Sequence, residues 1–231
     1  MGMYLVLVIG IMIISWSVQN SLKRKFKKYS EVGLSMNLSG KEVAELMLRD
    51  NGIHDVQVVS VQGRLTDHYN PVDKTVNLSP EVYSGRSVMA AAVAAHECGH
   101  AVQHATAYKP LEMRSALVPI QNASGRIMNI VFMALLIGSF AGSAFLSFEM
   151  AGLVIVGAYT VFTLFAFITL PVEYDATKRA LAWVNERNIV TGREHEMATD
   201  ALNAAARTYL VAALGSLAML VYYALAFLGN D

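Results

Sequence analysis

Four long stretches without a charged side chain limit what this chain can fold into. They are residues 1–22, 127–148, 150–172 and 208–230. Each has about the 20 residues that a helix needs to cross the hydrocarbon core of a bilayer. Any one of these stretches could instead be a buried core helix. However, the chain has four such apolar stretches in only 231 residues. We therefore expect a mainly α-helical, polytopic membrane protein with about four transmembrane helices.

The order of charges around these stretches predicts how the chain lies in the membrane. Five basic residues lie within 23–28, after the first apolar stretch, whereas a cleaved signal peptide has its basic residues before the stretch. All 18 Lys and Arg residues fall in 23–126 and 173–207, which four spans would place on one side. The positive-inside rule makes that side the cytoplasm. The first stretch is thus predicted to be a retained anchor, and the polar segments to be cytoplasmic.

These boundaries divide the chain into six predicted segments. The transmembrane helices are expected at 1–22, 127–148, 149–172 and 208–229, with a tight turn around Glu149, and the cytoplasmic segments at 23–126 and 173–207.

The segment 23–126 has the pattern of a small α+β domain. Residues 39–51 read as an amphipathic helix that Ser39 can cap. Residues 56–61 alternate like a strand, 75–78 are a short second strand, and 66–71 form a polar loop between them. We therefore expect a small β-hairpin or sheet beside helices. An Ala-rich helix is predicted over 87–108, because it has no Pro until Pro110.

Composition excludes several classes of function. The formal net charge is zero, so no global basic field favours binding to nucleic acid. The single cysteine, Cys98, rules out an intramolecular disulfide. A transporter or membrane scaffold would be favoured by charged residues inside the spans, and 127–148, 150–172 and 208–230 contain none.

The predicted helix 87–108 contains the sequence HECGHAVQH at 96–104. On a helix, His96 and His100 are displaced by about 40° around the axis and about 6 Å along it, so both imidazoles can reach one metal ion. Glu97, about 100° further round, can stand beside a metal-activated water and take its proton. H-E-x-x-H therefore predicts two zinc ligands and a general base. Gly99 and Ala101 are small and are expected to leave room for substrate.

Two other residues of this helix are weaker candidates. His104 lies about 12 Å along an unbroken helix from His96, too far to share one ion, so we expect it to support the site or to lie at the surface. Cys98 lies about 200° round from His96 and is expected to be a packed residue.

A catalytic zinc usually has three protein ligands and one open position. Glu173, directly after the third span, is the candidate third ligand, and Asp175 is its local competitor. The two are about 200° apart on a helix, so both are not expected to bind the same ion. Asp175 is then a candidate to hold a zinc-bound imidazole by its other N–H group. Arg179 is a candidate to steady Asp175 or to bind a peptide carbonyl.

Several motifs together resemble a known family. HECGHAVQHA, PVEYDATKRAL and LTDHYNP with TVNLSPEVYSGRS are similar to the YugP-like neutral zinc metallopeptidases of bacteria, over most of residues 30–190. More distantly, the plan resembles the membrane gluzincins, the family of the heat-shock membrane peptidase and the prenyl-protein endopeptidase. The resemblance implies a bacterial cell-membrane (inner or plasma membrane) location, a zincin-like catalytic domain and one Zn²⁺ per chain.

The resemblance also implies roles for individual residues: His96, His100 and Glu173 as ligands and Glu97 as base. The distant relatives usually place an Asp four residues after the ligand Glu, a position that is Thr177 here.

We therefore expect a multi-pass zinc endopeptidase that acts on peptide or protein substrates at the cytoplasmic membrane face. His68, Tyr69 and Tyr174 are candidates to stabilise the oxyanion. The strand at 56–61 or at 75–78 is a candidate to pair with an extended substrate.

The alternative to an endopeptidase is a non-proteolytic protein with a structural zinc, which normally has four protein ligands. An intramembrane protease is disfavoured because Gln103 and His104 are too polar for lipid. The sequence does not predict an oligomeric state.

Overall fold

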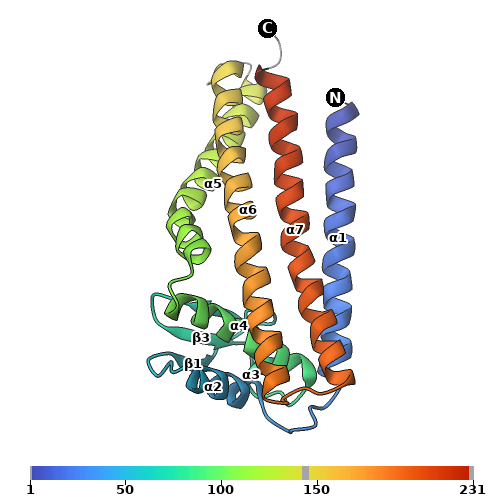
Figure 1. The fold of residues 1–231 in the computed structure, drawn as a ribbon. Coiled ribbons are helices and arrows are strands. Elements are labelled where there is room, and N and C mark those ends of the chain that lie inside the picture. The colour runs from blue at the N-terminus through green and yellow to red at the C-terminus, as the bar shows by residue number, and fades with distance from the viewer. Residues whose placement is uncertain (1, 142–145, 229–231) are drawn as a thin grey trace. The chain divides into compact units, whose positions relative to one another are not determined.

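The computed structural model describes residues 2–141 and 146–228, most of which are helical (Figure 1). In chain order the elements are α1 (Gly2–Ser30), α2 (Gly40–Asp50), β1 (Gln57–Ser60), β2 (His68–Asn70), β3 (Thr75–Leu78), α3 (Pro80–Tyr83), α4 (Val88–Ala105), α5 (Lys109–Ala141), α6 (Phe148–Glu186) and α7 (Arg193–Leu228). The chain forms two compact units. Unit 1 comprises Met1–Ser15, Met113–Leu170 and Tyr209–Asp231, and unit 2 comprises Trp16–Glu112 and Pro171–Thr208.

Four helices, α1, α5, α6 and α7, are long and apolar enough to cross a membrane. In the most apolar 18 residues of each, no more than 22% of the residues are buried within the protein. Large apolar side chains such as Ile130 and Leu153 are instead 68% and 62% exposed. Long helices that expose so many large apolar side chains are suited to contact with lipid. The predicted fold class, mainly helical with about four membrane-spanning helices, is confirmed.

The helices extend well beyond the predicted spans. α5 begins at Lys109 and α6 continues to Glu186 with Pro171 inside it, so both run through predicted segment boundaries. The end of the predicted span 127–148 and part of the turn before Glu149 fall on residues 142–145, which lie outside the described residues, as do Met1 and 229–231. The apolar core of unit 1 is built from the side chains of Met128, Val131, Ala151, Ile155, Ala158, Met219 and Tyr223.

Unit 2 contains a three-stranded sheet with the order β1-β3-β2. β1 pairs with β3 in parallel, with Gln57 opposite Thr75, and β2 pairs with β3 antiparallel, with His68 opposite Asn77. The two predicted strands are therefore neighbours but do not form a hairpin. The hairpin joins β2 and β3, through a turn in which the Asn70 side chain accepts hydrogen bonds from the N–H groups of Val72 and Asp73.

This topology corrects two predictions about the strands. The segment 66–71 was expected to be a loop, yet residues 68–70 within it form β2, because three residues are too few for alternation to reveal a strand. β3 was a candidate to pair with substrate, but it is the central strand and both of its edges are occupied. The free edges of the sheet belong to β1 and β2.

Side-chain caps fix the two helices at the centre of unit 2. Ser39 and Glu42 form a reciprocal capping box at the start of α2. Ser87 caps α4 by accepting a hydrogen bond from the N–H of Ala90 at 3.1 Å. α4 then runs through the core with most of its residues buried, packed against α2, α3, β2 and β3. Neighbouring elements approach α4 closely on several sides, and small side chains allow this close packing. The packing therefore explains the many alanines of this helix.

Polar contacts attach the helices of unit 2 to one another. Asp50, at the end of α2, accepts hydrogen bonds from the indole N–H of Trp183 at 2.9 Å and from Arg187 Nε at 2.6 Å. In α7, Asp200 binds Lys25 Nζ and the Tyr29 hydroxyl of α1.

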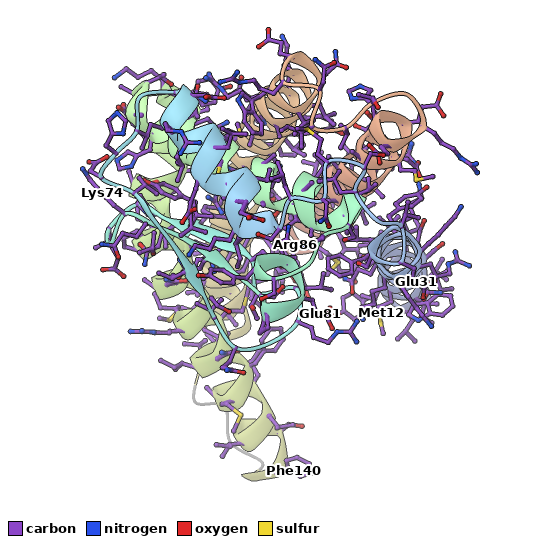
Figure 2. The ribbon with its side chains drawn as sticks, turned by 90° about the horizontal axis from the view of Figure 1, so that it is seen from below. Met12, Glu31, Lys74, Glu81, Arg86 and Phe140 are labelled. Carbon is purple, nitrogen blue, oxygen red and sulfur yellow. The ribbon has the colours of Figure 1, made fainter. Side chains whose placement is uncertain are left out.

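The side chains labelled in Figure 2 show how the units differ at their surfaces. Those of unit 2 are the exposed charged residues Glu31, Lys74, Glu81 and Arg86, whereas those of unit 1 are the exposed apolar residues Met12 and Phe140.

Candidate metal centre

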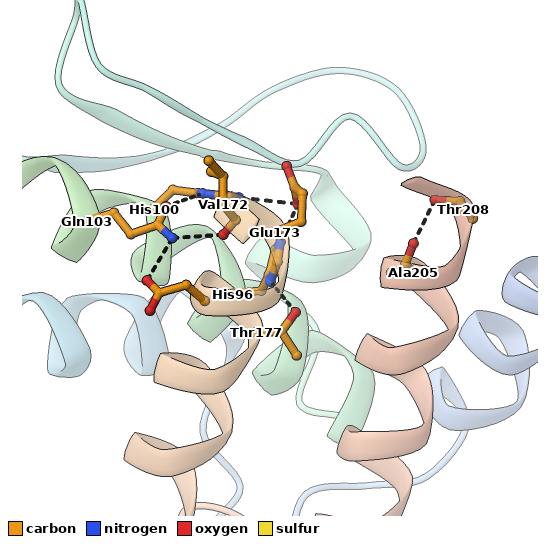
Figure 3. A network of polar contacts seen from close by, with 9 residues as sticks. His96, His100, Gln103, Val172, Glu173, Thr177, Ala205 and Thr208 are labelled. Carbon is orange, nitrogen blue, oxygen red and sulfur yellow. Dashed lines mark hydrogen bonds and ion pairs between the residues drawn. The ribbon is translucent and has the colours of Figure 1, made fainter. Parts of the chain in front are cut away.

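Two helices of unit 2 bring three metal-ligating side chains together. α4 supplies His96 and His100, one turn apart, and the C-terminal part of α6 supplies Glu173 (Figure 3). One donor atom from each side chain lies within 4.8 Å of the other two, and among residues 2–141 and 146–228 these are the three that form such a group. All three side chains are largely buried, with 13%, 9% and 4% of their surfaces exposed.

The separations of the donor atoms fit a single tetrahedral ion. Two ligands about 2.0–2.1 Å from a tetrahedral zinc stand roughly 3.3 Å apart. Glu173 Oε2 lies 3.3 Å from His96 Nε2 and 3.6 Å from His100 Nε2. The same oxygen is fully buried and has no hydrogen-bond partner among the described residues. A buried carboxylate oxygen with two imidazole nitrogens at ligand spacing is a donor set that suits Zn²⁺.

The far nitrogen of each imidazole has its own partner. Thr177 Oγ1 lies 3.2 Å from His96 Nδ1, and Gln103 Oε1 lies 3.0 Å from His100 Nδ1 (Figure 3). Both rings therefore turn Nε2 toward Glu173. Thr177 stands four residues after Glu173, the position at which the resemblance to the membrane gluzincins would place an Asp. Here a neutral hydroxyl takes that place.

Gly99 lets the two helices approach closely enough to form the group. A Cβ atom on Gly99 would lie 2.6 Å from the carbonyl oxygen of Ala176 in α6 and 3.1 Å from its carbonyl carbon. Real Cβ atoms essentially never come so close to backbone atoms. The expectation that Gly99 leaves room for substrate is therefore wrong for this residue, whose open side is filled by α6.

Gly99→Ala is expected to push α4 and α6 apart, because the clash is with the backbone and cannot be relieved by a side-chain rotation. We expect a loss of about 1–3 kcal/mol in the free energy of unfolding, together with weaker zinc binding. Thermal unfolding and a zinc competition titration measure the two effects. Gly125→Ala is the matched control: a Cβ on that helical glycine meets no atom within 4 Å, so it should change neither quantity adversely. Unchanged zinc affinity in Gly99→Ala would contradict this account of the helix contact.

Glu97 lies beside the three ligands and is also buried, with 8% of its surface exposed. Burial raises the pKa of Glu97 above its ordinary value. The charges of Glu173 and Asp67 act in the same direction, while His96 and His100 oppose the shift. A carboxylate whose pKa is moved toward neutrality is suited to accept a proton and to give it up again.

Asp175 reaches an imidazole only indirectly. Its Oδ2 accepts hydrogen bonds from Gln103 Nε2 at 2.9 Å and from Arg179 Nε at 2.6 Å. The prediction that Asp175 holds an imidazole N–H itself is therefore corrected: the amide of Gln103 stands between them. The prediction that Arg179 steadies Asp175 agrees with this contact.

The remaining candidates take part in other contacts. The ring of His104 lies against Tyr69, whose hydroxyl is 2.7 Å from His104 Nδ1. His68, in β2, has its Nδ1 2.7 Å from the carbonyl oxygen of Thr66, and Tyr174 is 44% exposed.

Cys98 is fully buried, with Sγ 3.6 Å from the carbonyl oxygen of Ala44 in α2. Burial raises the pKa of the Cys98 thiol, so this side chain is a packed residue.

Two residues of the site were not proposed from the sequence. Thr177 was noted only as a departure from a motif, and Gln103 only as a polar residue. The sequence does contain a signal for Gln103: it lies three residues after His100, hence on the same helix face, in an Ala-rich helix.

Comparison with known proteins assigns the chain to a family. A family described as "Putative neutral zinc metallopeptidase" matches residues 4–228. The chain belongs to this family. The protein named "Putative membrane protease YugP" from Bacillus subtilis (strain 168) is 37% identical over 230 residues, which cover 99% of each chain. No solved structure matches the chain significantly. The resemblance inferred from the motifs is thus confirmed.

Proposed function

We propose that this protein is an integral-membrane zinc endopeptidase that hydrolyses peptide bonds at the cytoplasmic face of the membrane. The observation that carries the proposal is the convergence of His96, His100 and Glu173 on one point, with the buried carboxylate of Glu97 beside them. Membership of a zinc metallopeptidase family and likeness to a protein named as a membrane protease support it.

The residues of the site divide the work of the proposed reaction. His96, His100 and Glu173 hold one zinc ion per chain. When bound, the ion supplies a Lewis acid that polarises a carbonyl group and makes water a stronger acid. Glu97 takes a proton from the attacking water and passes it to the nitrogen of the leaving amine. Burial raises the pKa of Glu97 above its ordinary value, which makes this carboxylate a better proton acceptor.

The site favours catalysis over a purely structural zinc. A structural zinc normally has four protein ligands, whereas the group found in the described residues has three. Cys98, which lies between the two histidines in the sequence, contacts α2 instead. Three protein ligands leave one position for water or substrate, which is the arrangement of catalytic zinc sites.

The distribution of charge supports the proposed orientation. All 18 Lys and Arg residues lie in 23–126 and 173–207, which also contain the four proposed site residues. An alternating path through four spans places both segments on the same side, and an excess of basic residues marks the cytoplasmic side.

Removal of zinc from the detergent-purified full chain is expected to abolish cleavage of an unfolded test protein such as casein. Dialysis against a chelator removes the ion, and one equivalent of Zn²⁺ should restore the activity, because three ligands hold the ion while a fourth position stays open. Mg²⁺ should not restore it, since this ion prefers oxygen ligands in octahedral geometry. A chain that binds one zinc but never cleaves casein would favour the non-proteolytic alternative.

A further inference from the structure

Gln103 is the one fully buried amide beside the candidate ligands, and all of its polar atoms are used. None of its surface is exposed. Its Nε2 donates hydrogen bonds to the carbonyl oxygen of Val172 at 2.8 Å and to Asp175 Oδ2 at 2.9 Å. Its Oε1 faces His100 Nδ1 at 3.0 Å (Figure 3). A polar side chain in the core of an alanine-rich helix is costly unless it is fully satisfied, as this one is.

These partners allow only one orientation of the amide. Both groups in contact with Nε2, a carbonyl and a carboxylate, are acceptors, so the NH₂ end must face them. The oxygen end must then face His100. Because that oxygen can only accept, Nδ1 of His100 has to carry a proton.

A proton on Nδ1 leaves Nε2 of the neutral ring with a free lone pair. That lone pair faces Glu173 Oε2 at 3.6 Å, and the carboxylate oxygen is an acceptor too. Two acceptors that face each other in a buried site repel, unless a cation or a proton lies between them. Gln103 therefore prepares His100 for a positive ion at the position that Glu173 shares.

The amide is itself supported from the α6 side. Asp175 Oδ2 accepts from Gln103 and from Arg179 Nε, which fixes the carboxylate at the end of the amide. The guanidinium of Arg179 in turn lies 5.7 Å from the ring centroid of Tyr108. A chain of contacts thus leads from the partly exposed Arg179 through Asp175 and Gln103 to His100.

We propose that Gln103, supported by Asp175 and Arg179, is a positioning residue that holds His100 in the tautomer and orientation that bind zinc. The inference rests on the proposed function in that it requires the zinc site. It adds that the affinity of the site depends on an amide that does not touch the ion. Groups that orient a metal-bound imidazole are worth about 10- to 100-fold in metal affinity.

The first test measures the zinc affinity of the detergent-purified full chain by competition with a chromophoric chelator. Gln103→Met keeps the length of the side chain but removes both hydrogen-bonding ends, and we expect zinc affinity to fall about 10- to 100-fold. Asp175→Ala should have a smaller effect in the same direction, because Val172 still orients the amide. The metal-free melting temperature, recorded in parallel, separates this loss from a loss of fold.

Asn77→Leu is the matched control for the removal of a buried amide. Asn77 is 8% exposed and donates its hydrogen bonds to the β2 and β3 backbone and to the Thr75 hydroxyl, away from the imidazoles. This variant is expected to lower the melting temperature and to leave zinc affinity unchanged in the folded fraction.

A rescue experiment keeps the inference testable if Gln103→Met does not fold. Gln103→Glu sets a carboxylate against that of Asp175 and should weaken zinc binding. Adding Asp175→Asn restores a donor opposite the new carboxylate, which can still accept from His100. Because the Val172 carbonyl still faces an oxygen, the double variant should recover part of the affinity. Wild-type affinity in Gln103→Met, or a double variant no better than Gln103→Glu, would overturn the inference. Failure of the wild-type chain to bind zinc would instead overturn the proposed function.

Discussion

Glu97→Gln is expected to retain one zinc per chain and to lose nearly all proteolytic activity. The amide has the size and shape of the carboxyl group but cannot take a proton from water, and general acid–base catalysis is worth about 10²- to 10⁴-fold. Because Glu97 is not one of the three grouped donors, the metal site should survive the change. The replacement also removes a buried group that can be charged, so stability should be equal or higher.

The measurement is the initial rate of casein cleavage by zinc-loaded wild type and Glu97→Gln at equal metal content. Glu186→Gln, at the exposed end of α6, is the matched control and should cleave at the wild-type rate. A Glu97→Gln variant with wild-type activity would show that Glu97 is not the base. A variant that loses its zinc would show that Glu97 belongs to the ligand set.

Glu173→Ala is expected to lose both zinc and activity. The carboxylate provides the only oxygen in the group of three donors. This oxygen lies 3.3 and 3.6 Å from the two imidazole nitrogens, which is the spacing of two ligands on one ion. Removing a direct ligand should weaken binding by more than the roughly 10- to 100-fold that outer residues contribute. Metal analysis by mass spectrometry, together with the casein assay, checks both parts of the prediction.

Asp175→Ala is the informative comparison for Glu173→Ala, because the sequence left these two acids as competitors. In the structure Asp175 contacts Gln103 and Arg179, so its removal should reduce zinc affinity less than removal of Glu173. If Glu173→Ala kept its zinc while Asp175→Ala lost it, the acid of the site would have to be reassigned.

The sequence predicted those features that depend on local pattern. The four apolar stretches predicted the membrane-spanning helices, Ser39 and Ser87 lie at helix starts, and the H-E-x-x-H spacing set His96 and His100 on one helix face. Each of these signals is contained within about 20 residues, where helix periodicity and capping act directly.

The features that the sequence did not predict depend on contacts between distant segments. β2 is a strand because its backbone pairs with the edge of β3. The parallel pairing of β1 with β3 likewise cannot be predicted from the sequence of either strand alone. Gly99 was expected to leave room for substrate, but the backbone of Ala176 in α6 occupies the space beside it. The role of Gln103 needed Val172 and Asp175, about 70 residues away along the chain, to show which way its amide points.

The central claim is that His96, His100 and Glu173 hold one zinc ion and leave a fourth position open. X-ray absorption at the zinc edge of the full chain tests it most directly. We expect one zinc per chain with about four nitrogen or oxygen ligands near 2.0–2.1 Å, of which two are imidazoles, and no sulfur. A sulfur ligand, a third or fourth imidazole, or a purified chain that cannot take up zinc would contradict it.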